Sequence, residues 1–233
     1  MSLSVPQREQ LENATAYYQQ NVLAAKDYLL ARGLTGEIAM RARLGVVVEP
    51  LLGHEQMAGR LAIPYLTEAG PVDIRFRCLE QHSCKDAGHG KYLTLPGHPP
   101  RMFNASALSI DTTTVAVCEG ELDTLIVHHH LGLPAVGVPG AQVWSGQKHY
   151  PRMFRPFTRV LVFADGDDAG RDLGKQIARD VPQAVVLRMP DGADVTDTFL
   201  AEGVGLVSIA LGCFGIAEIT KNLDSREERS PFN

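Results

Sequence analysis

The stretch VLVFADGDDAG, residues 160–170, decides the fold because its hydrophobic run ends abruptly in acidic residues. Such a run predicts a buried strand, followed at Gly170 by a helix. Three acids lie at the C-terminal tip of this strand, where open α/β sheets hold their ligands: Asp165, Asp167 and Asp168. The carboxylates at this tip are therefore the first candidates for a functional site.

The same pattern occurs earlier in the chain. Residues 113–118 form a second hydrophobic run, and the acidic turn EGELD, residues 119–123, follows it directly. Strands and helices then alternate to the end of AVVLRMP, which predicts right-handed crossovers and one parallel sheet. Because the carboxyl ends of parallel strands meet at one edge of a sheet, we expect the two acidic turns to share a site.

Glu119, Asp165 and Asp167 are the residue types that Mg²⁺ needs, because this hard cation takes oxygen ligands and keeps waters for a phosphate-bearing substrate. Carboxylates crowded at an apolar sheet edge would repel one another unless cations lay between them. A pair of ions can activate an attacking oxygen and stabilise a leaving one, so the pattern indicates phosphoryl chemistry. A solvated acidic turn is the alternative that these residues leave open.

The composition indicates a globular chain that can bury a sizeable core. The chain has 233 residues, 45% of them hydrophobic, and no apolar run approaches the roughly 18 residues needed to cross a bilayer. The N-terminus MSLSVPQREQ lacks the pattern of a signal peptide, so we expect a cytoplasmic protein without a membrane partner. The four cysteines include no C-x-x-C pair, and we expect reduced thiols.

The charge is distributed unevenly along the chain. Residues 1–110 carry 11 Lys and Arg against 10 Asp and Glu, which leaves 11 against 17 for residues 111–233. The acidic excess therefore lies in the half that carries the acidic turns. We predict an α/β protein in which a smaller, mixed α+β basic subdomain, residues 1–110, precedes a Rossmann-like parallel-sheet domain, residues 111–205. A short helix and a polar tail, residues 206–233, follow.

The first subdomain begins with helical periodicity and continues with short β-like runs. Apolar residues at intervals of three and four predict one helix over residues 9–31, and Thr35 is placed to cap a shorter helix. Over residues 45–104, hydrophobic runs separated by Gly and Pro predict a small, mostly antiparallel sheet. Arg75 and Arg77 alternate, so both project from one face; they form either an anion-binding pair or a solvated surface.

A loop in this subdomain carries four potential soft-metal ligands. They are spaced C-x3-H-x-C-x4-H, at Cys78, His82, Cys84 and His89. Four nitrogen and sulfur ligands suffice for tetrahedral zinc, although the spacing matches no standard zinc knuckle or finger. A loop with incidental Cys and His is the favoured interpretation, and structural zinc is the alternative.

The two acidic turns resemble the two motifs of toprim domains, which occur in primases, topoisomerases and OLD-type nucleases. The first motif corresponds to Glu119-Gly120 with Asp123, and the second to Asp165-x-Asp167 followed by Ala169-Gly170. Other segments resemble the polymerase core of bacterial DnaG-type primases, particularly short phage versions: YLLARGLT at 28–35, RLAIPY at 60–65, VDIRFRCL at 72–79, KYL at 91–93, GVPGA at 137–141, and the aspartates Asp194 and Asp197.

The resemblance implies a DNA primase, a nucleotidyltransferase that makes short RNA primers from ribonucleoside triphosphates on a single-stranded DNA template. By this resemblance Glu119 ligates metal or handles protons, while Asp165 and Asp167 hold the Mg²⁺ or Mn²⁺ ions that grip the triphosphate. Asp123 and Asp168 would be supporting metal ligands. The residues implied to contact template or nucleotide lie in the basic subdomain: Arg60, Arg75, Arg77, Lys91 and Tyr92.

Alternatives to primer synthesis remain open. The same acids and metals would cleave a phosphodiester if water replaced the 3′-hydroxyl, which makes a toprim nuclease the main alternative. The upstream segments favour a primase, because a nuclease has no need of them; a non-catalytic single-strand-binding component of the replisome is a third hypothesis. The zinc ribbon and helicase-binding domain of bacterial primases find no match. We therefore expect a replicative helicase or a separate zinc-binding module as partner, in a bacterial host cytoplasm if a phage encodes the chain.

Overall fold

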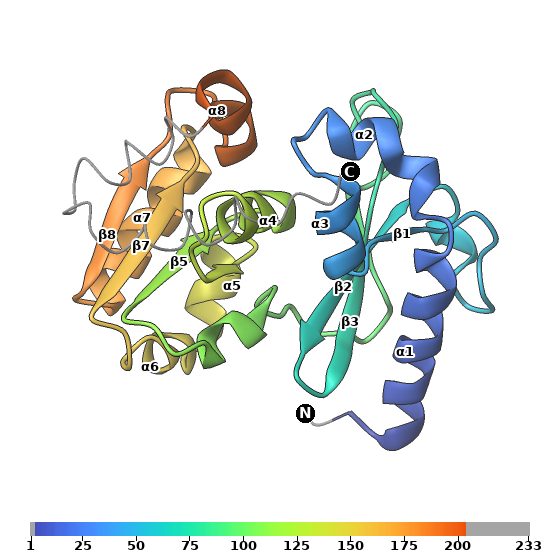
Figure 1. Ribbon diagram of the computed structural model, residues 1–233, viewed down its shortest axis with the longest axis horizontal. Coiled ribbons are helices and arrows are strands. Elements are labelled where there is room, and N and C mark those ends of the chain that lie inside the picture. The colour runs from blue at the N-terminus through green and yellow to red at the C-terminus, as the bar shows by residue number, and fades with distance from the viewer. Residues whose placement is uncertain (1–2, 204–233) are drawn as a thin grey trace, which may run out of the picture. The chain divides into compact units, whose positions relative to one another are not determined.

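The computed structural model describes residues 3–203, and the chain folds as two compact units (Figure 1). The first unit extends to Ser106, and the second begins at Ala107. The predicted C-terminal helix and tail, residues 206–233, lie outside the described residues. No helix among the described residues combines the length and apolar character that a membrane span requires.

The first unit opens with helical segments. The predicted single helix over residues 9–31 is wrong, because the structure divides this region between three helices: α1 (Val5–Gln19), η1 (Val22–Ala25) and α2 (Lys26–Leu30). The break follows α1, where the Asn21 amide donates to the Tyr18 carbonyl at 3.0 Å and tightens the last turn. Asn is a weak helix former, which favours an interruption at this position.

An antiparallel sheet follows the helices, as the hydrophobic runs predicted. A further short helix, α3 (Gly36–Arg41), precedes it, and the Thr35 hydroxyl caps that helix by accepting a hydrogen bond from the Ile38 amide at 3.3 Å. The sheet has the order β1-β2-β3-β4, with strands β1 (Gly45–Val46), β2 (Leu61–Thr67), β3 (Gly70–Arg77) and β4 (Tyr92–Thr94). The 3-10 helices outside the sheet are η2 (Glu55–Met57) and η3 (Ala105–Ser109).

The core of the first unit lies between α1 and this sheet (Figure 1). Tyr18 on α1 is buried, and the Phe76 ring on β3 lies edge-on to it with the centroids 6.3 Å apart. The other buried members of this cluster come from the helix, the sheet and the segment between β1 and β2: Leu11, Ala14, Val47, Met57, Ala62 and Ile74. Burial of one sheet face against α1 leaves the opposite face to the arginines of β3.

The second unit is a parallel sheet with helices between its strands, which confirms the predicted α/β alternation. Its order is β6-β5-β7-β8, with strands β5 (Thr114–Cys118), β6 (Ala135–Gly137), β7 (Arg159–Ala164) and β8 (Ala184–Arg188). The helices are α4 (Glu121–His129), α5 (Ala141–Gly146), α6 (Tyr150–Met153), α7 (Asp168–Asp180) and α8 (Val195–Glu202). The central strands β5 and β7 are buried beyond their first residues, which explains their continuous hydrophobic runs.

Candidate functional site

The carboxyl ends of the central strands β5 and β7 carry the acids of the candidate site. The register pairs Cys118 with Phe163, so Glu119 follows β5 at the same sheet edge at which Asp165 follows β7. Helix α4 begins at Glu121, two residues after Glu119, and helix α7 begins at Asp168, three residues after Asp165. The structure therefore brings the two acidic turns together at one edge of the parallel sheet.

Asp165 is the carboxyl group most strongly affected by its neighbours. Its pKa rises from 3.8 to about 8 because the group is buried and because other carboxylates lie near it: Asp123, Glu119, Asp194 and Asp167. Its Oδ1 atom is buried without a hydrogen-bond donor. In the absence of cations Asp165 is therefore mainly protonated at neutral pH, and a cation that binds must displace this proton.

Glu119, at the end of β5, is also partly buried close to other carboxylates. Its Oε2 atom is buried without a donor, and burial, with the charges of Asp167 and Asp123, raises its pKa. Buried polar atoms nearly always have partners in native structures, so two unpaired carboxylate oxygens at one edge require an explanation. A divalent cation with oxygen ligands supplies one, and the residues present fit Mg²⁺ or Mn²⁺.

The two acids at the start of α7 are placed differently. Asp167 is the N-cap of the helix, and its Oδ1 atom accepts a hydrogen bond from the Gly170 amide at 2.8 Å. A Cβ atom at Gly170 would overlap the backbone of Asp165, so the glycine allows the helix to start this close to the strand end. Asp168 is exposed and pairs with Arg171, and it is absent from the carboxylates that raise the pKa of Asp165.

Asp123 is held in position by Thr196 at the start of α8. Its Oδ1 atom accepts hydrogen bonds from the Thr196 amide at 3.0 Å and from the Thr196 hydroxyl at 2.6 Å. Asp194 is a site residue that was not predicted from the sequence, and its charge also raises the pKa of Asp165. The signal that could have found it is the segment GADVTD, in which Asp194 caps α8.

In the first unit, arginines and tyrosines pack together on β3 and β4. The Arg75 guanidinium carbon lies 4.5 Å from the centre of the Tyr92 ring, and that of Arg77 lies 5.2 Å from the same ring. Arg77 also lies 5.8 Å from the Tyr28 ring and donates a hydrogen bond to the Tyr92 hydroxyl. Cation–π contacts of this kind fix the guanidiniums in place while leaving their charge intact.

Arg60 is placed differently from the other predicted phosphate ligands. Its side chain is 8% exposed, and its Nη1 atom donates to the carbonyls of Gly90 and Lys91 at 3.0 and 3.4 Å. Its Nη2 atom lies 3.2 Å from Nδ1 of His89. These partners support a role in holding the chain that leads into β4, next to the exposed Lys91.

A pocket of about 700 Å³ opens in the first unit beside these residues. Its basic lining side chains are Arg32, Arg77, Lys85 and Lys91. Glu80 is the acidic residue of the lining, and the aromatic ring of Tyr28 forms part of the wall. Basic groups beside an aromatic ring are suited to bind a phosphate together with a base or sugar.

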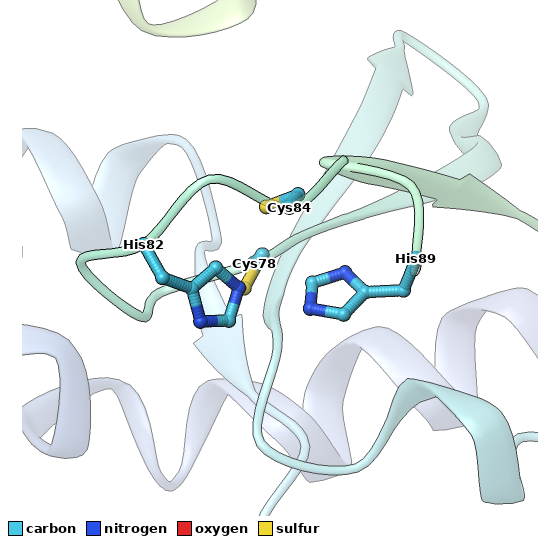
Figure 2. Close-up of side chains that lie close together, drawn as sticks. All are labelled: Cys78, His82, Cys84 and His89. Atoms are coloured by element: carbon cyan, nitrogen blue, oxygen red, sulfur yellow. The ribbon is translucent and has the colours of Figure 1, made fainter. Parts of the chain in front are cut away.

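The structure also gathers the four potential soft-metal ligands of the sequence. The ligand atoms of Cys78, His82, Cys84 and His89 all lie within 4.8 Å of one another, with both imidazole rings turned toward the two thiols (Figure 2). Among residues 3–203, these four are the group of His, Cys, Asp and Glu side chains that lie close enough together to hold one metal ion. The carboxylates at the edge of the parallel sheet lie farther apart.

Two kinds of known protein resemble this chain in sequence: a phage protein and bacterial DNA primases. No family model matches the chain. The Gene 57 protein of Mycobacterium phage D29 is 37% identical over 150 residues, which are 62% of this chain and 93% of that protein. The DNA primase of Pseudomonas aeruginosa is 28% identical over 232 aligned positions, 83% of this chain. The chain spans only 34% of the length of that primase.

The fold agrees with the sequence comparisons. A solved DnaG primase catalytic domain bound to single-stranded DNA superimposes with a TM-score of 0.64, covering 86% of this chain and 78% of that chain at 21% identity. The antiparallel sheet followed by the parallel sheet is thus the fold of DnaG primase catalytic cores. The chain belongs to the same family as the Gene 57 protein of phage D29, which it matches over nearly that protein's whole length, and it has the fold of DnaG primase catalytic cores.

Proposed function

We propose that this chain is a DNA primase core that links ribonucleotides on a single-stranded DNA template. The observation that carries the proposal is the group of carboxylates at the carboxyl edge of the parallel sheet. Two of their oxygens, on Glu119 and Asp165, are buried without donors. That arrangement suits metal-assisted phosphoryl transfer, and the similarity to DNA primases supports nucleotidyl transfer as the reaction class.

Glu119, Asp165 and Asp167 are the proposed metal ligands, and Asp123 and Asp194 are the proposed supporting acids beside them. Bound Mg²⁺ or Mn²⁺ would neutralise the triphosphate and polarise the attacking oxygen. Thr196 holds the Asp123 carboxylate by two hydrogen bonds, which fixes this acid in position. The exposed Asp168 pairs with Arg171, so we place it outside the ligand set.

The basic side chains of the first unit are proposed to bind the phosphates of template or nucleotide. Arg75 and Arg77 are held against Tyr92, and Lys91 lies exposed at the rim of the pocket. Pre-positioned guanidiniums lose little side-chain freedom when they bind phosphate. The charge balance of the first unit, nearly neutral overall, allows such local clusters to act without repulsion from a large acidic excess.

The test is ribonucleotide incorporation by the full chain, with a single-stranded DNA template, labelled ribonucleoside triphosphates, and Mg²⁺ or Mn²⁺. Short labelled RNA products are expected, and Asp165→Asn should abolish them. Asp172→Asn is the matched control, because Asp172 is exposed on α7 and pairs with Lys175 on the same helix. Cleavage of the DNA without incorporation would replace the proposal with a nuclease, and binding without either reaction would indicate a non-catalytic component.

A further inference from the structure

The segment that joins β3 to β4 forms a closed loop. The Cys78 amide donates to the Lys91 carbonyl at 2.8 Å, which closes the loop at its base. Within the loop, the His89 amide donates to the Cys84 carbonyl at 2.9 Å and brings these two residues together. Positions 79–88 carry few apolar side chains, so hydrophobic burial contributes little to the order of this loop.

The ligand atoms in the loop lie near the spacing of a tetrahedral metal site. Zinc–sulfur bonds of about 2.3 Å and zinc–nitrogen bonds of about 2.0 Å put the ligand atoms about 3.3–3.8 Å apart. Sγ of Cys78 and Nε2 of His82 lie 3.7 Å apart. The remaining separations lie within 4.8 Å, so they exceed the spacing around a bound zinc by no more than about 1.5 Å.

The imidazoles have partners for their other ring nitrogens. Nδ1 of His82 lies 3.0 Å from Oε2 of Glu80, and Nδ1 of His89 lies 3.2 Å from both the Gly90 carbonyl and Nη2 of Arg60. Because a guanidinium can only donate, metal binding through Nε2 of His89 requires Nδ1–H to donate to the Gly90 carbonyl rather than accept from Arg60. When Nδ1–H donates to an oxygen, Nε2 keeps its lone pair for a metal. Metal-ligating histidines commonly have such a carboxylate or carbonyl partner, and both partners come from the loop itself.

We propose that Cys78, His82, Cys84 and His89 bind one Zn²⁺ ion in a closed structural site (Figure 2). Two sulfur and two nitrogen ligands complete a tetrahedron, so no position is left for a substrate. The ion clamps the loop, which contributes Lys85 and Lys91 to the lining of the basic pocket. Arg60 holds the end of the same loop by donating hydrogen bonds to the carbonyls of Gly90 and Lys91.

The first test is the zinc content of the purified full chain, supplied with zinc and then dialysed against buffer without a chelator. About one zinc per chain is expected, and Cys84→Ser should lose it. His149→Gln and Asp165→Asn are controls that should retain the ion, because one removes an exposed histidine and the other a carboxylate of the parallel sheet. Loss of zinc from the unaltered chain during dialysis would overturn the proposal.

The second test uses the unaltered chain and therefore does not depend on whether Cys84→Ser folds. Co²⁺ exchanged into the site should show the strong visible absorption and the sulfur-to-metal charge transfer of a tetrahedral thiolate site. The weak absorption of six-coordinate Co²⁺ would exclude these ligands. Neither measurement requires primer synthesis, so the zinc site can fail while the proposed primase activity stands, and the reverse.

Discussion

The edge of the parallel sheet and the loop between β3 and β4 both gather metal-ligand side chains, but they do so by opposite means. At the sheet edge, the ligands are carboxylates, and burial together with their mutual repulsion raises the pKa of Asp165 to about 8. In the loop, the ligands are thiols and imidazoles, and His82 already has a carboxylate partner in Glu80. At the sheet edge a bound cation would favour the charged form of Asp165, whereas the four ligands of the loop lie within reach of one ion.

The difference separates a reactive site from a structural one. Oxygen ligands at an open sheet edge suit a hard cation that keeps positions for water and phosphate. Four nitrogen and sulfur ligands within 4.8 Å suit a closed ion that holds the chain in place. Changes at the sheet edge should therefore abolish reaction without loss of fold, and changes in the loop should alter local stability.

The largest effect is expected for Asp167→Asn at the sheet edge. Incorporation should fall at least about 100-fold, or about 3 kcal/mol in the barrier, because an amide is a weaker metal ligand than a carboxylate. Asn still caps a helix, so the hydrogen bond to the Gly170 amide and the circular dichroism should persist. Full activity with unchanged circular dichroism would remove Asp167 from the ligand set.

Removal of zinc with a soft-metal chelator should act on the other region. The free energy of local opening at β3, β4 and their loop should fall by about 3 kcal/mol, because an ion that binds only the folded loop stabilises it. Hydrogen exchange of the backbone amides measures this for each segment. The strands of the parallel sheet serve as the internal control, and equal acceleration in both sheets would contradict a local clamp.

The pH dependence of stability should also distinguish the two regions. The folded pKa of Asp165, about 8, lies above its ordinary value of 3.8, so between these values the folded state binds more protons than the unfolded state. Without divalent cations, stability should therefore fall as pH rises through this window, on the order of 2 kcal/mol after allowance for solvent screening. Denaturant unfolding of Asp165→Asn should show a flatter profile. A profile identical to that of the unaltered chain would exclude Asp165 as its source.

The smallest effect is expected for Arg75→Ala on β3, which removes one of the two arginines that pack on Tyr92. Affinity for single-stranded DNA should fall about 3- to 10-fold, and the salt slope should decrease by about 0.7, because one phosphate contact is lost. Fluorescence anisotropy across a salt series measures both values. Arg41→Ala is the matched control, because Arg41 pairs with Glu37 on the surface of α3. An equal loss for both variants would indicate a general charge effect.

The sequence was more informative about the parallel sheet than about the first unit. The runs at residues 113–118 and 160–164 predicted strands that end in acid, and the parallel pairing of β5 with β7 confirms the expected common edge. The helix over residues 9–31 was predicted wrongly, because periodic apolar positions continue across the break at Asn21. Hydrophobic periodicity reports which face is buried, and it does not report where a helix is interrupted.

The roles of individual site residues also could not be read from the sequence. The acidic turns are visible in the sequence, yet nothing in them reveals that Asp168 pairs with Arg171 while the distant Asp194 acts on Asp165. Arg60 is one basic residue among others in the sequence, and only its burial and its bonds to Gly90 and Lys91 give it a supporting role. These roles depend on contacts between side chains and on contacts between segments that lie far apart in the sequence.

The sequence by itself determined the alternation of strands and helices in the second unit and the acids at two strand ends. Hydrophobic runs and turn residues are local properties of the chain, so they can be read without the fold. Only the tertiary structure decided the protonation of Asp165, the anchoring of Asp123 by Thr196, and the convergence of two thiols and two imidazoles in one loop. Each of these depends on distances between side chains and on their shielding from water, which folding alone creates.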